Sequence, residues 1–138
     1  MNDVVELANV IYGEAAGEDF DTMRMVGSTI LNRFKSGRNI EFGYTIPEII
    51  QKGYYAAINQ NEPYQQALSQ KFPDKNAENK YKTALQIASG LYKGTIEPQE
   101  GMFYFTDKEI KKMTKKKDFD FGLVREINKT GKYRIFSY

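Results

Sequence analysis

The hydrophobic residues in the first two-thirds of the chain follow the spacing of helices. They recur every three or four positions, as on the buried face of a helix, and polar or glycine-containing segments separate the runs. This pattern predicts five helices, over residues 3–15, 21–35, 45–52, 62–70 and 76–92. Asn2 is the expected N-cap of the first helix, and Thr45 that of the third, with Glu48 as its capping-box partner.

The last third of the chain predicts a small β element. An aromatic run over residues 102–106 suits a short strand, and a short helix capped at Thr106 is expected to run through Met113. Residues 123–128 and 133–136 flank a glycine-containing turn, which predicts a β-hairpin. The expected fold class is therefore mainly α (α+β), with a helical domain and a hairpin and short strand near the C-terminus.

Composition narrows the classes of protein that fit. With 138 residues, 41% of them hydrophobic and 28% charged, the chain is expected to form one globular domain over residues 1–138. Its formal net charge is only +2, so a dedicated nucleic-acid binder is not expected. One local run is rich in lysine, and it suits either a solvated surface or a contact with an anionic cell wall. Its members are Lys111, Lys112, Lys115, Lys116 and Lys117.

The absence of cysteine and histidine limits the available chemistry. The sequence contains neither residue, which excludes disulfides, thiol nucleophiles, thiolate metal ligands and imidazole catalysis. We therefore expect no cofactor and no metal site. No hydrophobic run reaches the ~18 residues that suggest a membrane-spanning helix, so no membrane span is expected.

Residues 11–18 combine hydrophobic, small and acidic side chains in a way that suits acid catalysis. Two carboxylates, Glu14 and Glu18, lie four positions apart at the end of the apolar stripe of the first helix. Such a glutamate is expected to be partly desolvated, and desolvation raises a carboxyl pKa toward the value that a general acid needs near neutral pH. The alternative is a solvated helix end that carries two surface glutamates.

Five segments, taken in order, resemble the spore-cortex-lytic enzyme family of cell-wall hydrolases. They are Tyr12–Glu18, Ile30–Arg33, Gly53–Ala56, Gly101–Phe105 and, more loosely, Gly131–Phe136. The first two segments, at their spacing of roughly a dozen residues, are fairly specific for the family. The other three are weak singly and support the resemblance only because they occur in the family's order. The resemblance covers nearly the whole chain and implies a lysozyme-like fold, a peptidoglycan substrate and Glu14 as the catalytic acid.

The chain departs from the family pattern at several positions. Ala16 stands where the family usually has arginine, and Tyr54 and Ala56 stand where it usually has glutamine and serine. The family's C-terminal histidine is absent as well. These departures put the polar contacts of the corresponding loops in question, whereas Glu14 is retained.

The chemistry of glycosidic cleavage favours a mechanism with one acid. Glycosidases usually place two carboxylates on opposite sides of the bond, whereas Glu14 and Glu18 would share a helix face unless Gly17 ends the helix between them. A lytic transglycosylase needs one glutamate, because the muramyl 6-hydroxyl attacks intramolecularly and gives a 1,6-anhydro product. We therefore expect this reaction at the β-1,4 bond between N-acetylmuramic acid and N-acetylglucosamine, with Glu18 as a supporting or second carboxylate.

Tyrosines near these segments are candidates for substrate binding. Their rings stack on sugars and their hydroxyls hydrogen-bond to acetamido groups, although core packing is the alternative for each of Tyr12, Tyr55 and Tyr104. Side chains alternate between the two faces of a strand, so Tyr104 is expected to point away from its phenylalanine neighbours and toward Glu14.

Asn32 and Arg33 end the second helix. We expect them to fix that helix end or, in a sharper alternative, to support Glu14.

Two further functions stay open. The first is a hydrolytic muramidase, which would cleave the same bond as a lytic transglycosylase. The second is a non-catalytic glycan-binding or phage-particle protein on the same fold. The expected partner in every case is the glycan strand of peptidoglycan, bound by a monomer or by a component of a phage particle. The N-terminus lacks the features of a signal peptide, so we expect synthesis in the cytoplasm and action on the wall after lysis or delivery by a phage.

Overall fold

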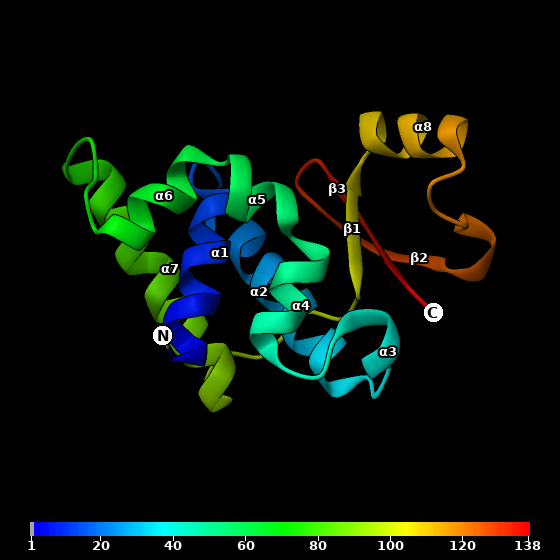
Figure 1. The fold of residues 1–138 in the computed structure, drawn as a ribbon, viewed down its shortest axis with the longest axis horizontal. Helices are drawn as coiled ribbons and strands as arrows, with labels where there is room; N and C mark the ends of the chain where they lie inside the picture. The colour runs from blue at the N-terminus through cyan, green and yellow to red at the C-terminus, as the bar shows by residue number, and fades with distance from the viewer. Residues whose placement is uncertain (1) are drawn as a thin grey trace.

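The computed structural model describes residues 2–138 and shows a mainly α-helical protein with a small antiparallel sheet at one end (Figure 1). The α-helices are α1 (Asp3–Ala15), α2 (Phe20–Lys35), α3 (Asn39–Phe42), α4 (Ile46–Gly53), α5 (Tyr55–Gln60), α6 (Glu62–Ser69), α7 (Lys75–Lys93) and α8 (Asp107–Lys116). The strands are β1 (Phe103–Thr106), β2 (Arg125–Thr130) and β3 (Tyr133–Ser137), and a short 3-10 helix, η1, spans Phe121–Leu123. The predicted mainly α (α+β) class is confirmed.

Helix α1 is the centre of the helical part. It packs against α2, α6 and α7, and residues 7–13 are all buried. The helices approach closely at Gly27 of α2, where an added Cβ would lie 2.7 Å from a methyl carbon of Leu91 and 2.8 Å from one of Ile11. Glycine at this position therefore allows α2 to lie against both α1 and α7.

The sheet has the strand order β1–β3–β2, with both pairs antiparallel. β2 and β3 form a hairpin whose turn contains Gly131 at a φ of 55°, in the left-handed region that favours glycine. β1 pairs with β3 from the other side, so that Tyr104 lies opposite Ile135. β1 also contacts α2 and α8, and it therefore links the sheet to the helical part.

Phenylalanine side chains form a cluster around the sheet and the segment after α8. Neighbouring ring centroids in this cluster lie 4.9 to 6.4 Å apart, and its members are Phe103, Phe105, Phe119, Phe121 and Phe136. Phe103 and Phe105 stack at an interplanar angle of 14°, so they share one face of β1. Tyr104 between them therefore points to the opposite face, as the strand alternation predicted.

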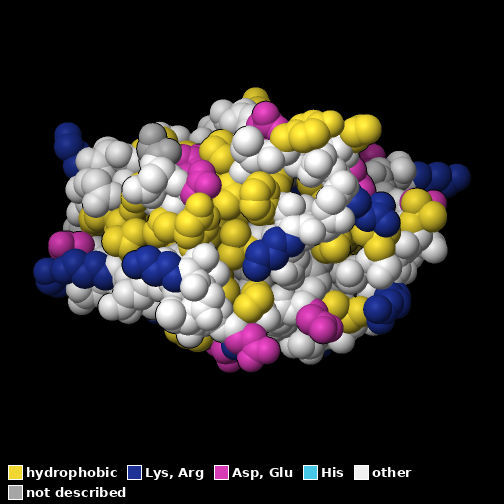
Figure 2. All heavy atoms as spheres, turned by 90° about the horizontal axis from the view of Figure 1, so that it is seen from below, with side chains coloured by type: hydrophobic (Ala, Val, Ile, Leu, Met, Phe, Trp, Pro, Cys, Tyr) yellow, Lys and Arg dark blue, Asp and Glu magenta, His cyan; other side chains and the backbone are white. Residues whose placement is uncertain are grey.

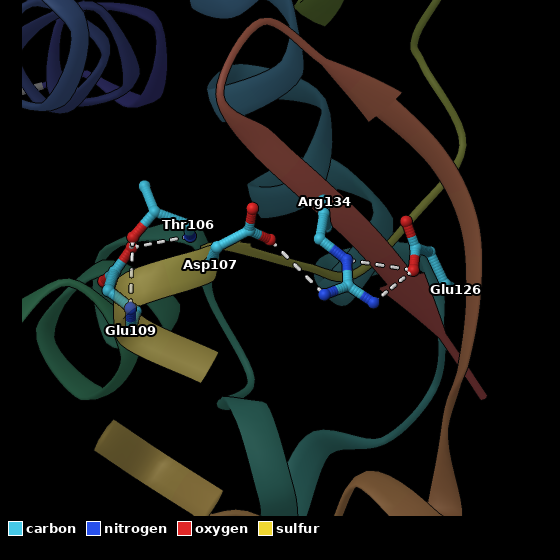
Figure 3. A network of polar contacts seen from close by, with 5 residues as sticks. All are labelled: Thr106, Asp107, Glu109, Glu126 and Arg134. Carbon is cyan, nitrogen blue, oxygen red and sulfur yellow. Dashed lines mark hydrogen bonds and ion pairs between the residues drawn. The ribbon is translucent and has the colours of Figure 1, made fainter. Parts of the chain in front are cut away.

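A polar network fixes the start of α8 to the sheet. Arg134 of β3 donates to Glu126 of β2 at 2.7 Å and to Asp107 of α8 at 3.3 Å (Figure 3). Thr106 and Glu109 form a capping box, in which each side chain accepts a hydrogen bond from the backbone N–H of the other. These contacts fix the first turn of α8, and with it Glu109, relative to β1.

The five predicted helices and the caps at Asn2 and Thr45 are confirmed. Glu48 differs from the prediction, because its carboxylate accepts from the N–H of Tyr44 rather than from the N–H of the cap residue Thr45. The helices α3 and α5 were not predicted. They contain four and six residues, which is too short to show a helical period.

The C-terminal elements are confirmed with shifted boundaries. α8 continues to Lys116, beyond the predicted end at Met113. Leu123 belongs to η1 rather than to the hairpin, and the hairpin turn is shorter than predicted because Lys129 and Thr130 still pair with β3.

The helices and one face of the surface were also compared with the features of membrane-spanning and strongly charged proteins. Within residues 2–138, no helix combines the length and the hydrophobicity that crossing a membrane requires. Figure 2 shows one face of the molecule, on which hydrophobic side chains gather in a band and acidic and basic side chains are interspersed. Charge of both signs is therefore mixed on this face.

Candidate active site

Glu14 lies in the last turn of α1 and is partly buried. The helix ends at Ala15, and the chain then turns through Gly17 before Asp19 caps α2. The seven buried residues before Glu14, residues 7–13, anchor the helix in the core, so its carboxyl is carried on a rigid element. Rigid support of this kind keeps a catalytic group in a fixed geometry.

The surroundings of Glu14 raise its pKa. Burial of the carboxyl contributes most, and the negative charge of Glu109 on α8 adds to it. A hydrogen bond from the Tyr104 hydroxyl acts in the opposite direction, because it stabilises the charged carboxylate. Glu14 therefore holds its proton at a higher pH than an exposed glutamate does, which a general acid requires.

Tyr104 connects Glu14 to two further tyrosines. Its ring centroid lies 6.3 Å from that of Tyr54 and 5.4 Å from that of Tyr133, with the latter pair nearly perpendicular at 88°. Burial raises the pKa of Tyr104 well above its ordinary value, and the charges of Tyr54 and Glu14 act in the same direction. The hydroxyl therefore stays protonated at neutral pH and can donate to Glu14.

Tyr54 lies at the corner between α4 and α5 and is buried. Its hydroxyl is 2.7 Å from that of Thr29. Since the Thr29 hydroxyl donates its own hydrogen to the Val26 carbonyl, Tyr54 is the donor in this pair. The tyrosine that replaces the family's usual glutamine is thus fixed at its hydroxyl, and its ring supports Tyr104.

Arg33 lies behind this tyrosine pair. Its guanidinium carbon is 5.1 Å from the ring centroids of Phe42, Tyr54 and Phe103, and its Nε donates to the Met102 carbonyl at 2.7 Å. This side chain joins the end of α2 to the residue just before β1 and packs against the aromatic rings of both parts.

Asn32 makes a parallel connection. Its side-chain amide donates to the carbonyls of Gln99 and Gly101, both at 2.8 Å. Together with Arg33, it holds the segment that enters β1. The structure thus places both residues where they position β1 and its Tyr104, rather than in contact with Glu14 itself.

Glu18 lies after the end of α1, in the turn that leads to α2. Its carboxylate forms an ion pair with Lys132 of the hairpin turn at 3.3 Å, and both side chains are partly exposed. Lys132 in turn lies 5.4 Å from the ring centroid of Tyr133. Glu18 therefore connects the α1–α2 turn to the β2–β3 hairpin, next to Tyr133.

The two other predicted tyrosines lie in different settings. Tyr12 is only 2% exposed, its ring contacts Phe72 and Tyr81, and its hydroxyl donates to Gln66 at 3.0 Å. The structure therefore places it in the core, against the expectation of a substrate contact. Tyr55 starts α5 with its side chain exposed, and a sugar contact by this residue stays a prediction.

Three residues of the site were not predicted from sequence. They are Tyr133, Lys132 and Glu109. The capping-box pattern of Thr106 and Glu109 was readable in the sequence and would have placed Glu109 in the first turn of α8. Nothing local indicated Tyr133, because it reaches Tyr104 through the pairing of β1 with a strand almost thirty residues later. Within residues 2–138, no three acidic side chains are grouped so as to hold a metal ion.

Comparison with known protein families gives one match. The model of a family described as Cell Wall Hydrolase matches residues 17–129, which is most of the chain. The protein therefore belongs to the cell-wall hydrolase family, whose members are enzymes that act on peptidoglycan. No curated protein matches the chain, and no solved structure matches it.

The matched segment includes most residues of the site but not Glu14. Tyr54, Tyr104 and Arg33 fall within it, as do Glu18 and Glu109. Glu14 lies three residues before the match begins, so its assignment depends on its structural setting. The family model also covers β1 and α8, which carry Tyr104 and Glu109, the two residues that act on the pKa of Glu14.

Proposed function

We propose that the protein is a lytic transglycosylase that cleaves the β-1,4 bond between N-acetylmuramic acid and N-acetylglucosamine. The observation that carries this proposal is the setting of Glu14, a partly buried carboxyl that accepts a hydrogen bond from Tyr104 and has a raised pKa. Family membership supplies the substrate class, peptidoglycan.

In the proposed reaction, Glu14 acts first as the acid and then as the base. Its carboxyl gives its proton to the glycosidic oxygen as the bond from C1 of the muramyl residue breaks, and the N-acetylglucosamine 4-hydroxyl leaves. The carboxylate then takes the proton of the muramyl 6-hydroxyl, whose oxygen bonds to C1 and closes the 1,6-anhydro ring. Glu14 is protonated again at the end, and no water is consumed.

The hydrogen bond from Tyr104 suits this double role. A phenol that donates to the carboxylate stabilises the charged form between the two steps, while burial and Glu109 favour the protonated form at the start. Burial and Glu109 thus raise the pKa of the carboxyl that gives the proton, and Tyr104 acts against them when the same carboxyl has to take a proton back.

The other carboxylates near the site have structural partners. Glu18 is paired with Lys132, and one oxygen of Glu109 accepts from the N–H and the hydroxyl of Thr106. These partners favour an electrostatic role for Glu18 and Glu109 over direct participation. A single-acid reaction needs neither of them.

A hydrolytic muramidase is the second candidate, and one observation favours it. Glu109 lies close enough to Glu14 for its charge to raise the pKa of that carboxyl, so it is available as a second carboxylate. In that reaction a water molecule or the carboxylate itself would attack C1. A non-catalytic glycan-binding role is the third candidate, and it makes no use of a glutamate with a raised pKa.

Mass analysis of the products separates these candidates. Purified peptidoglycan is incubated with the protein, and the released muropeptides are compared with those from the Glu14→Gln variant. We expect 1,6-anhydro-muramyl ends from the wild type only. Reducing muramyl ends would show a muramidase, and wall binding without any product would show a glycan-binding protein.

We also propose a lysozyme-like relationship and a route to the wall by cell lysis or with a phage particle. A lysozyme-like relationship would be tested by an experimental structure with a bound glycan, which should lie across Glu14 and Tyr104. The route to the wall, by lysis or with a phage particle, would be tested by searching for the protein in purified phage particles of the source bacterium.

A further inference from the structure

Positive charge is concentrated on one helix of this nearly neutral chain. Residues 107–117 hold six lysines, against only Asp107 and Glu109 as acids, a net charge of +4. The whole chain has 20 basic and 18 acidic residues, so the remainder carries 14 and 16, a net charge of −2. On the face drawn in Figure 2, by contrast, acidic and basic side chains are interspersed.

The lysines of α8 lie on the side of the helix that faces solvent. Ile110 and Met113 are partly buried and form the apolar side. At about 100° per residue, the five lysines within the helix lie on the opposite side, and all of them are exposed. They are Lys108, Lys111, Lys112, Lys115 and Lys116, named here the lysine face. None of them is within ion-pair distance of an acidic residue among residues 2–138.

The lysine face works against the stability of its own helix. Like charges three or four positions apart on a helix repel, and every lysine of the face has another at such a spacing. Lys115 and Lys116 in the last turn interact favourably with the helix dipole, but Lys108 in the first turn meets its positive end. Asp107 and Glu109 stand four and three positions before Lys111 and Lys112 and offset part of this repulsion, whereas Lys108 has no acid at such a spacing.

The helix that carries the lysine face begins near the candidate active site. α8 follows β1 directly, and Glu109 in its first turn acts on the pKa of Glu14. Figure 1 shows α8 at the end of the molecule beyond the sheet, with its outer side uncovered. A polymer held on the lysine face would therefore be held on the same helix that carries Glu109.

We propose that the lysine face of α8 binds a polyanionic polymer of the cell wall, one with a negatively charged group at regular intervals. This inference rests on the proposed function only for the choice of the wall as the target. Ammonium groups recognise phosphates and carboxylates as point charges, without a preformed pocket. A polyol-phosphate chain linked to the glycan is the occupant that fits, because it carries one such charge per repeat, and the carboxylates of the stem peptides are the competing source that the test must exclude.

The test measures binding to purified wall in the Glu14→Gln background, so that the wall is not cut during the assay. The test variant carries Lys108→Gln, Lys111→Gln and Lys112→Gln. A matched control carries Lys35→Gln, Lys71→Gln and Lys93→Gln, three exposed lysines on other elements. At low salt we expect about fivefold weaker binding per lysine removed from α8, by analogy with lysines at anionic membrane surfaces, and little loss in the control.

A salt series and two treatments of the wall define the ligand, and a thermal melt checks the fold of the test variant. Binding of the parent should fall steeply as salt rises to ~0.5 M, where surface charges are screened. Acid extraction of the phosphate polymers should abolish most of the binding, whereas amidation of the peptide carboxylates on a separate wall sample should leave it unchanged, and the reverse result would contradict the inference. The melting temperature of the test variant should stay close to that of the parent, because all three lysines are exposed and surface substitutions usually change stability little.

Several results would overturn the inference. Equal losses in the test variant and the control would mean that only net charge matters, and unchanged binding in the test variant would remove α8 from recognition. Duplex DNA that competes as well as wall polymer would assign the face to nucleic acid. Failure of the proposed function would be seen separately. If the protein with Glu14 intact releases no muropeptides, but the Glu14→Gln parent binds wall through α8, this inference still stands.

Discussion

The phenol of Tyr104 lies near enough to the carboxyl of Glu14 to lower its pKa by hydrogen bonding, and this relationship connects the sheet with the end of the first helix. Glu109, three residues after β1 ends, acts on the same carboxyl through its charge. One short segment therefore carries two influences on Glu14 of opposite sign. The first lowers its pKa and the second raises it.

Tyr104→Phe and Glu109→Gln should therefore shift the pH profile of wall cleavage in opposite directions. Loss of the Tyr104 hydroxyl raises the pKa of Glu14, so the alkaline limb of kcat/KM should move to higher pH. Loss of the Glu109 charge lowers that pKa and should move the limb to lower pH, while the glutamine oxygen can still accept from Thr106. Rates of muropeptide release measured across pH check both, and shifts in the same direction would contradict the assignment.

Glu14→Gln should abolish cleavage while the fold is retained, since the amide keeps the shape of the side chain and cannot give a proton. The loss should be at least ~10²-fold, the usual contribution of a general acid. Muropeptide release and circular dichroism on the same sample check the two parts. Retention of most of the activity in a folded variant would remove Glu14 from the reaction.

The same substitution should stabilise the protein at neutral pH. A carboxyl whose pKa is higher in the folded than in the unfolded state binds an extra proton on folding, so stability falls as pH rises through that window. The cost is absent below pH ~4, where the carboxyl is protonated in both states, and is fully present above the folded-state pKa. The difference in melting temperature between Glu14→Gln and wild type should therefore be positive at pH 7 and shrink in acid.

Glu18→Gln should reduce activity less than Glu14→Gln does. Its ion pair with Lys132 is partly exposed, so the loss of stability should be at most ~1 kcal/mol. Lys132→Gln is the matched variant and should have the same effect, because it breaks the same pair from the other side. A loss as complete as that of Glu14→Gln, at an unchanged melting temperature, would instead support a mechanism with two carboxylates.

The local parts of the site could be predicted from the sequence. The apolar stripe of α1 placed Glu14 at a helix end, and strand alternation placed Tyr104 on the face away from Phe103 and Phe105, which the structure confirms. Both depend on the residue and its near neighbours, which helix and strand periodicity describe well.

The parts that depend on tertiary contacts could not be predicted. Tyr133 joins the site through strand pairing, and Tyr54 through the corner between α4 and α5. The placement of Tyr12 is a different case. Residues two positions apart on a helix point about 200° apart, so a helix that directs Glu14 to the site turns Tyr12 toward α6 and α7.

Tyr104→Ala and Phe103→Ala should separate activity from stability. Phe103 is 6% exposed and its ring contacts Phe42, Phe105 and Phe119, so its truncation should cost ~3–5 kcal/mol of unfolding free energy. Tyr104 is partly exposed on the other face, so its truncation should cost less stability. Its loss should weaken glycan binding by ~1–3 kcal/mol, by analogy with aromatic stacking on bases. Thermal melts and wall-lysis rates of both variants decide the matter, and a Tyr104→Ala protein that unfolds while Phe103→Ala stays folded would reverse the two faces of β1.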